Sequence, residues 1–406
     1  MRKINPNNFH VATRGTSREI NRQIALNLVR THQPISRADL ARIMGVRRGA
    51  ASLIVNDLLA EGLIFEGATG ESHRGRKPTF LYIDSRGRCV VAVDIRVTRT
   101  SLMVTDLIGK QLVATSGFPT ERDPKRLVAE LGKRIKKVLS EHKEVGECKG
   151  VGVVVPGMVD RATSRIIHAP TLGWRDVEIR ESLASATGLP VHVENSGKAC
   201  ALAQIWAARG DTAATGDVVF VSVSDGIGVG IVVNGEILRG RHNIAGEFGH
   251  VPLSIDGPRC PCGATGCWEA YISNLATLSR YFGRNLREAK PVAAEVATFT
   301  IEDLIVRARA GDAKAVAAIE ATARYLGLGL ASIVNAVDPA RIYIGGEIIA
   351  AWDLIEADVR AALAERALSP DAAKTEIRVV SLEDQPRLRG AAALVTAPAF
   401  AAPPIA

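Results

Sequence analysis

Three cysteines and a histidine that lie close together in the sequence have side chains suited to binding a metal ion. Cys260, Cys262 and Cys267 fall within eight residues, and His250 precedes Cys260 by ten. Three thiolates and one imidazole complete a tetrahedral zinc site that leaves no position for water, which is typical of a structural metal. The spacing therefore predicts a structural Zn2+ site in the loop 250–267. The alternative is that the Cys-x-Cys pair is incidental and the histidine is an ordinary core residue.

A second chemical feature is a basic N-terminal segment. Residues 1–80 contain 13 Lys and Arg against 6 Asp and Glu, whereas the remaining 326 residues contain 38 against 37. Nearly all of the net charge of +8 therefore lies in the first fifth of the chain. A basic module attached to an electrically balanced body indicates binding to a polyanion.

The basic segment has the pattern of a helix-turn-helix. Thr16 with Glu19, and Ser36 with Asp39, have the spacing at which a side-chain oxygen and a carboxylate satisfy the free N–H groups at a helix start. An apolar helical periodicity follows each pair. Gly45 then breaks the second helix, and a third apolar periodicity follows it. Two helices joined by a short turn that contains Gly are typical of a helix-turn-helix.

Two strands are expected after the third helix, at 63–66 and 79–83, with a polar, glycine-rich connection that would form a wing. If the third helix lies in the major groove, its exposed face and the wing tip contact the DNA. The candidate DNA-binding residues are Arg47, Arg48, Ser52, Leu53, Asn56, Arg74 and Arg76. Arg47 stands where Ser or Thr would cap this helix. The alternative is a small protein-binding module with ordinary solvated arginines.

The rest of the chain alternates short β-branched runs with amphipathic helices. We expect strands at 89–95, 101–107, 150–157 and 190–195 in one lobe, strands at 218–224, 229–235 and 341–346 in a second lobe, and a helix at 312–337. This pattern predicts an α/β body of two lobes. Bodies of this kind bind their ligands in the cleft between the lobes.

Two segments carry a resemblance to a known family. GEFGHVPL at 246–253 and CPCGATGCWEAY at 260–271 resemble the GExGH and CxCGxxGCxE patterns of the ROK family (repressors, open reading frames and kinases). Further matches are RGRKP, VVVPGMVD, LGWRDVEI, TGLPVHVEN, DGIGVGIVVNG and IYIGGE. The resemblance implies an N-terminal winged helix-turn-helix (α+β) at 1–82 and a two-lobed, actin/hexokinase-like α/β domain at 83–406. The helix-turn-helix resembles the repressor branch, such as the xylose and N-acetylglucosamine repressors.

The resemblance also implies a sugar site in the cleft. The family's sugar contacts fall on Asn195, Glu247, His250 and Glu269. A sugar is a ring of hydroxyl groups, so it needs rigidly held donors and acceptors. His250 would use one ring nitrogen for zinc and the other for a hydroxyl. Without the resemblance, each acid alone is more readily interpreted as a surface or capping carboxylate.

Two features of kinase chemistry are missing from the sequence. The family's kinases have an Asp-x-Gly-Gly-Thr turn, and in the corresponding segment Asp94 to Thr98 side chains replace both glycines. The family's catalytic Asp is replaced by Ser196, which cannot act as a base at neutral pH. We therefore expect no catalytic residue and no enzyme activity. The glycines at 226, 228 and 230 are a weak phosphate-binding signal, so the alternative is an ATP-dependent ROK sugar kinase that carries a DNA-binding domain.

The sequence thus predicts a sugar-responsive, DNA-binding transcriptional regulator, with a repressor of carbohydrate uptake or catabolism genes as the main hypothesis. Its expected partners are double-stranded operator DNA, a small sugar or sugar phosphate, and a second copy in a homodimer or homotetramer. No uninterrupted apolar run reaches the roughly 18 residues of a membrane span, so we expect a cytoplasmic protein without a membrane partner. The proline-rich tail 396–406 is given no function.

Overall fold

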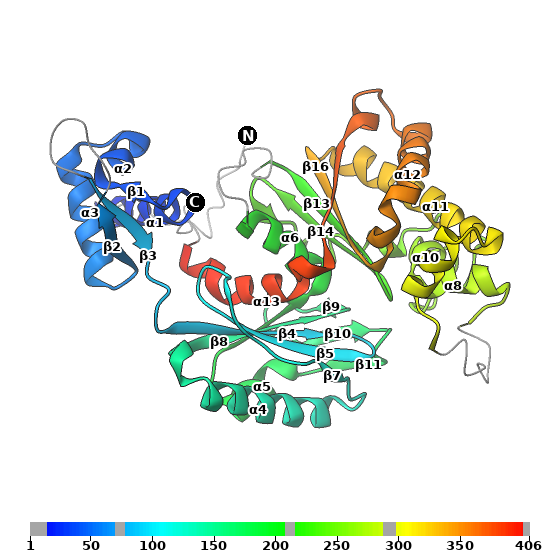
Figure 1. Ribbon diagram of the computed structural model, residues 1–406, viewed down its shortest axis with the longest axis horizontal. Coiled ribbons are helices and arrows are strands. Elements are labelled where there is room, and N and C mark those ends of the chain that lie inside the picture. The colour runs from blue at the N-terminus through cyan, green and yellow to red at the C-terminus, as the bar shows by residue number, and fades with distance from the viewer. Residues whose placement is uncertain (1–13, 70–77, 208–215, 287–297, 401–406) are drawn as a thin grey trace.

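The computed structural model describes residues 14–69, 78–207, 216–286 and 298–400, which form a small N-terminal module and two α/β lobes (Figure 1). The module has three helices and a three-stranded antiparallel sheet of order β1-β3-β2. It is the winged helix-turn-helix predicted from the sequence. Its elements are α1 (Arg14–His32), β1 (Ile35–Ser36), α2 (Arg37–Met44), α3 (Arg48–Ala60), β2 (Ile64–Thr69) and β3 (Thr79–Ile83).

Local sequence signals set both ends of α2. The Ser36 hydroxyl accepts a hydrogen bond from the backbone N–H of Asp39 at 3.1 Å, as predicted for a helix N-cap. Gly45 ends the helix in the left-handed conformation at φ 67°, which a residue with a side chain rarely adopts. Arg47 precedes α3 without a side-chain cap, also as predicted.

Two details of the module differ from the sequence-based predictions. α1 is already helical at Arg14, so Thr16 lies inside the helix and not at its N-cap. β2 continues to Thr69 beyond the predicted end at Glu66, because Thr79 of β3 provides a pairing partner there. The predicted boundary between residues 82 and 83 falls at the end of β3.

The first lobe is a mixed sheet of order β12-β8-β4-β5-β6, in which β7 also pairs with β5. Alternate residues of β4 point to opposite faces, so Val91 and Val93 pack beneath α4 and α5 while Val90 and Ala92 pack against α6 and α13. A small sheet, β11-β10-β9, adjoins it. The elements are β4 (Arg88–Ile95), β5 (Arg99–Thr105), β6 (Gln111–Ala114), β7 (Phe118–Pro119), α4 (Pro124–Glu141), η1 (Lys143–Val145), β8 (Glu147–Val155), β9 (Met158–Val159), β10 (Ile166–Ala169), β11 (Trp174–Val177), α5 (Ile179–Thr187), β12 (Val191–Asn195) and α6 (Ser196–Ala207).

The second lobe repeats this connectivity in a sheet of order β15-β14-β13-β16-β17. Each lobe therefore has three antiparallel strands followed by two parallel ones, and the predicted two-lobed, actin/hexokinase-like α/β fold is confirmed. The elements are β13 (Val218–Val223), β14 (Ile227–Val233), β15 (Glu236–Ile237), η2 (Phe248–His250), α7 (Glu269–Ile272), α8 (Asn274–Phe282), α10 (Ile301–Arg309), α11 (Ala313–Val337), β16 (Arg341–Gly346), η3 (Glu347–Ala351), α12 (Trp352–Arg366), η4 (Ala372–Lys374), β17 (Glu376–Val379), η5 (Leu382–Asp384), α13 (Pro386–Thr396) and η6 (Ala397–Phe400).

Two helices, α6 and α13, pack between the two lobes. α6 packs one side against β13 and β14 of the second lobe and another against α13, which covers the sheet of the first lobe (Figure 1). The approach is close, because a Cβ added at Gly390 of α13 would lie 2.1 Å from the carbonyl oxygen of Ala199 in α6. α6 and α13 thus connect both lobes mechanically.

The longest helix, α11, has the length and apolar composition of a membrane span. However, 56% of that stretch is buried inside the protein, where it packs on the sheet of the second lobe. It is therefore a core helix of that lobe.

Candidate functional site

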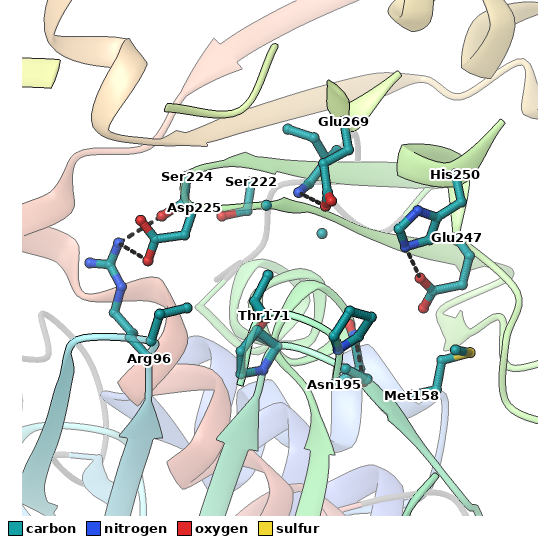
Figure 2. A pocket seen from close by; sticks show the side chains of 18 of the residues that line it. Arg96, Met158, Thr171, Asn195, Ser222, Ser224, Asp225, Glu247, His250 and Glu269 are labelled. Carbon is teal, nitrogen blue, oxygen red and sulfur yellow. Dashed lines mark hydrogen bonds and ion pairs between the residues drawn. The ribbon is translucent and has the colours of Figure 1, made fainter. Parts of the chain in front are cut away.

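A pocket lies between the lobes, where the β4–β5 turn and the start of α6 face the β13–β14 turn, η2 and α7 (Figure 2). Glu247, His250 and Glu269 reach it from the second lobe, and Asn195 reaches it from the first. These four residues are the predicted sugar contacts, and the fold brings them together although they come from three different segments of the chain.

Asn195 is buried at the end of β12, and its amide group is largely used by the protein itself. The amide oxygen accepts hydrogen bonds from the backbone N–H groups of Gly197 at 2.8 Å and Lys198 at 3.2 Å. The nitrogen donates to the carbonyl of Gly157 at 2.9 Å. Because an amide nitrogen carries two hydrogens, one donor remains for a ligand. Asn195 therefore links the pocket to the N-terminus of α6.

Glu269 lies between the pocket and the cysteine loop. One carboxylate oxygen accepts from the backbone N–H of Ile227 at 2.9 Å, and the other lies 3.6 Å from the Cys260 sulfur. Gly226 makes room for this arrangement, because a Cβ there would lie 2.7 Å from the same carboxylate. The carboxylate is thus fixed in orientation before any ligand binds.

Glu247 and His250 form the second-lobe wall of the pocket. A carboxylate oxygen of Glu247 lies 3.9 Å from Nε2 of His250. Burial raises the pKa of Glu247 above its ordinary value, although Lys198 and His250 oppose this rise. The Lys198 ammonium is itself buried, and it donates to the carbonyl of Asn243 at 2.7 Å. The Glu247 carboxylate and the His250 imidazole thus offer hydrogen-bonding groups to the pocket, which suits a ring of hydroxyls, while Lys198 lies behind them.

His250 also belongs to the cluster with Cys260, Cys262 and Cys267, whose ligand atoms all lie within 4.8 Å of one another. The sulfur atoms of Cys262 and Cys267 are 3.7 Å apart, and the Cys260 sulfur is 3.6 Å from Nδ1 of His250. Tetrahedral zinc, with bonds of about 2.3 Å to sulfur and about 2.0 Å to nitrogen, requires sulfur–sulfur separations of about 3.8 Å and sulfur–nitrogen separations of about 3.5 Å. The four side chains therefore fit a zinc ion, and Nε2 of His250 still faces Glu247.

Glycines shape the loop that carries the cysteines. Gly263 has φ 101° and Gly266 has φ 71°, both in the region that disfavours side chains. A Cβ at Gly266 would also lie 1.5 Å from the carbonyl oxygen of Ser254. Tight turning by glycine thus holds the donors together.

The candidate DNA-binding residues of the third helix share one face of the winged helix-turn-helix module. Ala51, Ile54, Val55 and Leu58 of α3 are buried. The opposite side of the helix and its start carry the predicted contacts, of which Ser52 is half-buried and the others are exposed: Arg47, Arg48, Leu53 and Asn56. Arg74 and Arg76 lie outside the described residues.

A sequence profile of the ROK family matches residues 90–397. This chain belongs to the ROK family. The xylose repressor of Bacillus subtilis (strain 168) is 28% identical over 87% of this chain and 88% of its own length. A glucokinase of Halalkalibacterium halodurans is 32% identical over 64% of this chain and 80% of its own length. A crystal structure of a ROK family transcriptional regulator, a homologue of the Escherichia coli MLC protein, superimposes with a TM-score of 0.78 at 26% identity and covers 95% of this chain and 97% of its own.

The coverage separates the two branches of the ROK family. The glucokinase accounts for about two thirds of this chain, whereas the transcriptional regulator of known structure accounts for nearly all of it. The resemblance to the regulator branch inferred from the sequence is confirmed.

In this ROK chain, side chains of the protein occupy the part of the cleft next to the β4–β5 turn. The Arg96 guanidinium donates to the Ser224 hydroxyl at 2.6 Å and lies 4.0 Å from Asp225 (Figure 2). It also donates to the Glu347 carboxylate at 2.5 Å. Burial alone would raise the pKa of Glu347, but Arg96 and neighbouring hydrogen bonds hold it below its ordinary value. Arg96 thus joins the first lobe to the second by a partly buried ion pair.

The glycine-rich stretch of this ROK chain has a packing role. A Cβ at Gly230 would lie 2.3 Å from the carbonyl oxygen of Gly197, and one at Gly228 would lie 3.3 Å from the backbone of Gly197. These two glycines allow the first turn of α6 to pack against β14. Close packing therefore accounts for them without a bound phosphate.

Sequence reasoning did not identify several residues of the cleft. Arg387 lines the pocket from α13 and donates to Asp94 at 2.8 Å, and Met158 and Thr171 line the pocket from the first lobe. No local pattern could have found Arg387, because 293 residues separate it from Asp94. Arg96 lies in the segment Asp94 to Thr98, where side chains replace the glycines of the kinase turn, but its partner Glu347 is 251 residues away.

Proposed function

We propose that this protein is a sugar-responsive, DNA-binding transcriptional regulator, and in the first instance a repressor of carbohydrate uptake or catabolism genes. One observation carries the proposal. The chain joins a winged helix-turn-helix to a ROK cleft in which Asn195, Glu247, His250 and Glu269 converge. We assign residues 1–82 to DNA binding and 83–406 to sugar binding.

The DNA contacts proposed for this regulator come from the start and exposed face of α3 and from the wing. Arg47 and Arg48 stand at the positive end of α3 and would bind phosphates or guanine edges. Arg74 and Arg76 of the wing would enter the minor groove. The remaining contacts would be made to base edges, by Ser52, Leu53 and Asn56.

The metal proposed for the cysteine loop is a structural zinc ion, held by His250, Cys260, Cys262 and Cys267. The zinc would supply a rigid link between the loop and η2. Nδ1 of His250 faces the cluster, so Nε2 is left for a sugar hydroxyl. The proposed zinc site thus orders one wall of the sugar site.

We propose that the cleft binds a sugar without phosphorylating it. Ser196 stands where the kinases of the family have a catalytic Asp, and Arg96 with Glu347 fills the space beside the turn. A serine has no carboxylate to accept the proton of the attacking hydroxyl. Sugar binding in the cleft, and not a reaction product, would then change the affinity of the protein for DNA. The similarity to glucokinases keeps one rival, a sugar kinase with a DNA-binding domain, which predicts sugar-dependent ADP production.

The proposed regulation requires a contact between the cleft and the DNA-binding module, and two helices supply one. α6 begins directly after Asn195 and ends near Trp206, over which the Arg30 guanidinium of α1 lies at 4.1 Å from the ring centroid. α13 carries Arg387 at its start and leads into η6, whose Phe400 is buried in the core of the N-terminal module. A movement of either helix would therefore reach α1.

The proposed partners are operator DNA, a sugar or sugar phosphate, and a second copy in a cytoplasmic homodimer or homotetramer. A dimer would place two α3 helices on a palindromic site, about 34 Å apart.

The experiment that tests the function measures binding of the full-length protein to DNA upstream of its own gene. We expect a shift in an electrophoretic assay that one member of a panel of pentoses, hexoses, amino sugars and their phosphates changes. Failure to bind any upstream DNA would contradict the proposal. Sugar-dependent ADP production at a rate typical of enzymes would favour the kinase.

A further inference from the structure

We propose that the regulator selects its DNA site chiefly through apolar contact between Leu53 and thymine methyl groups in the major groove. This inference rests on the proposed DNA-binding function and adds the chemical group that is recognised. It concerns the face of α3 that points away from the core of the module.

The exposed face of α3 carries few polar side chains. Gly49, Ala50, Leu53 and Asn56 share this face, and the half-buried Ser52 borders it, because residues three and four apart are neighbours on a helix. All four residues are exposed, and Leu53 is 68% exposed. Leucine and alanine cannot hydrogen bond to a base edge, so the group they can recognise is the methyl group that only thymine places in the major groove.

The one amide on this face is partly occupied by the protein. Oδ1 of Asn56 accepts a hydrogen bond from the guanidinium of Arg37 at 2.9 Å, and Arg37 is held in turn by the Glu66 carboxylate at 3.0 Å. The bidentate pairing of asparagine with adenine needs both the oxygen and the NH2 group. Arg37 thus uses one of the two lone pairs of the Asn56 oxygen and disfavours the bidentate pairing with adenine, which leaves Leu53 as the most exposed base-contacting side chain on this face.

The charges around this face favour DNA over an apolar protein partner. Arg47 and Arg48 are exposed at the start of α3, where the helix dipole is also positive. An apolar strip bordered by cations matches a groove with methyl groups on its floor and phosphates along its walls. Leu53 lies one helical turn after Gly49, so phosphate contacts by the arginines would bring it toward the bases.

The test begins with a duplex selected from a random-sequence DNA pool by the full-length protein. Each thymine of the selected duplex is then replaced singly by deoxyuridine, which removes only the methyl group. At one or two positions in each half-site we expect the dissociation constant to rise about three- to fivefold. This rise corresponds to the free energy of burying one methyl group. This scan uses the wild-type protein and does not depend on the folding of a variant.

Leu53→Ala identifies the side chain that reads the methyl group. The variant should bind the thymine and deoxyuridine duplexes equally at the sensitive positions. Leu368→Ala, a matched change at another exposed leucine in the second lobe, should retain the full sensitivity. The inference would be overturned if no deoxyuridine replacement changed the dissociation constant of a tightly bound duplex. It would also be overturned if Leu53→Ala remained as sensitive to these replacements as wild type. Neither result would contradict DNA binding. If the selection yields no duplex, the proposed DNA-binding function fails, and this inference fails with it.

Discussion

Single side chains of the proposed sugar site also hold the fold together. Asn195 caps α6 with its oxygen, and Glu269 accepts a backbone hydrogen bond from Ile227. These bonds fix the polar groups before a ligand arrives, so less conformational entropy is lost on binding. The same bonds make truncation of either residue damaging to the structure. An isosteric change is therefore the informative one.

Glu269→Gln keeps the shape of the side chain and the oxygen that accepts from Ile227, but it removes the charge. We expect sugar affinity to fall by about tenfold or more, because a hydrogen bond to a charged acceptor contributes about 1.5–3 kcal/mol. Calorimetry with the sugar that most raises the melting temperature measures the change. Glu178→Gln, at an exposed glutamate on the first lobe, should bind this sugar normally.

The zinc content of single-residue variants tests whether the cysteine loop binds the metal. We expect about one zinc per chain in the purified protein, and a lower zinc content and melting temperature in Cys262→Ser. Cys148→Ser changes a cysteine outside the cluster and should keep the metal. Elemental analysis and thermal unfolding provide both readouts. A wild-type protein that folds well without zinc would count against the site.

The sequence predicted the residues of the site better than their contacts. The cysteine spacing and the resemblance to the ROK family pointed to the metal cluster and to the four cleft residues. The Arg96–Glu347 and Arg387–Asp94 pairs were not foreseen, because ion pairs between distant segments leave no periodic trace. Fixed-spacing motifs can be read from one sequence, whereas contacts across the cleft require the fold.

At the scale of elements, α2 shows how strongly local chemistry determines a helix. Ser36 caps it and Gly45 ends it. Hydrogen bonds from the Ser36 hydroxyl and from Arg42 lower the pKa of Asp39, although burial opposes this shift. A carboxylate whose pKa is lower in the folded state than in the unfolded state stabilises the fold at pH values above the unfolded-state pKa. This stabilisation is lost as the pH falls through the folded value.

Ser36→Ala should therefore lower the free energy of unfolding of the module by about 1 kcal/mol at neutral pH. The difference from wild type should shrink in acid as Asp39 becomes protonated. Denaturant unfolding at several pH values measures it. Ser182→Ala, at an exposed helical serine that caps nothing, should stay within a few tenths of a kcal/mol of wild type. A pH-independent difference would contradict the role assigned to Asp39.

The sequence predicted the existence of strands better than the residues at which they end or the order in which they pair. The β-branched runs at 89–95, 190–195 and 341–346 are the strands β4, β12 and β16. Their sheet order could not be read from the sequence, because strand pairing is set by the packing of distant elements. The prediction that Thr16 caps the first helix was wrong. Its capping pattern is present, but Arg14 is already helical, so Thr16 lies inside α1.

On the scale of the whole molecule, Phe400, the last residue that the structure describes, makes a contact that no sequence motif predicts. The proline-rich tail was given no function, yet Phe400 packs in the core of the N-terminal module and edge-on against Trp206, with centroids 5.2 Å apart. Asn27 of α1 also donates a hydrogen bond to the carbonyl of Phe400. The first and last helical segments of the described chain are therefore joined.

Arg30→Ala tests whether this contact transmits the state of the cleft. The variant loses the cation–π contact and a hydrogen bond to the Trp206 carbonyl at 2.8 Å. We expect near-normal binding of sugar alone and of DNA alone, but a several-fold smaller effect of sugar on DNA affinity. Arg86→Ala removes a comparable contact, with Phe65 at 4.0 Å, away from this interface and should leave the effect unchanged. Undiminished coupling in Arg30→Ala would exclude this contact as the route.

The central claim, that occupancy of the cleft controls the DNA-binding module, is tested most directly by reciprocal titration of the full-length protein. DNA affinity is measured with and without saturating sugar, and sugar affinity with and without saturating DNA. Linkage requires both ratios to equal the same coupling factor, and we predict a factor of about 5–150. Sugar that binds equally well to the free protein and to its DNA complex would contradict the account.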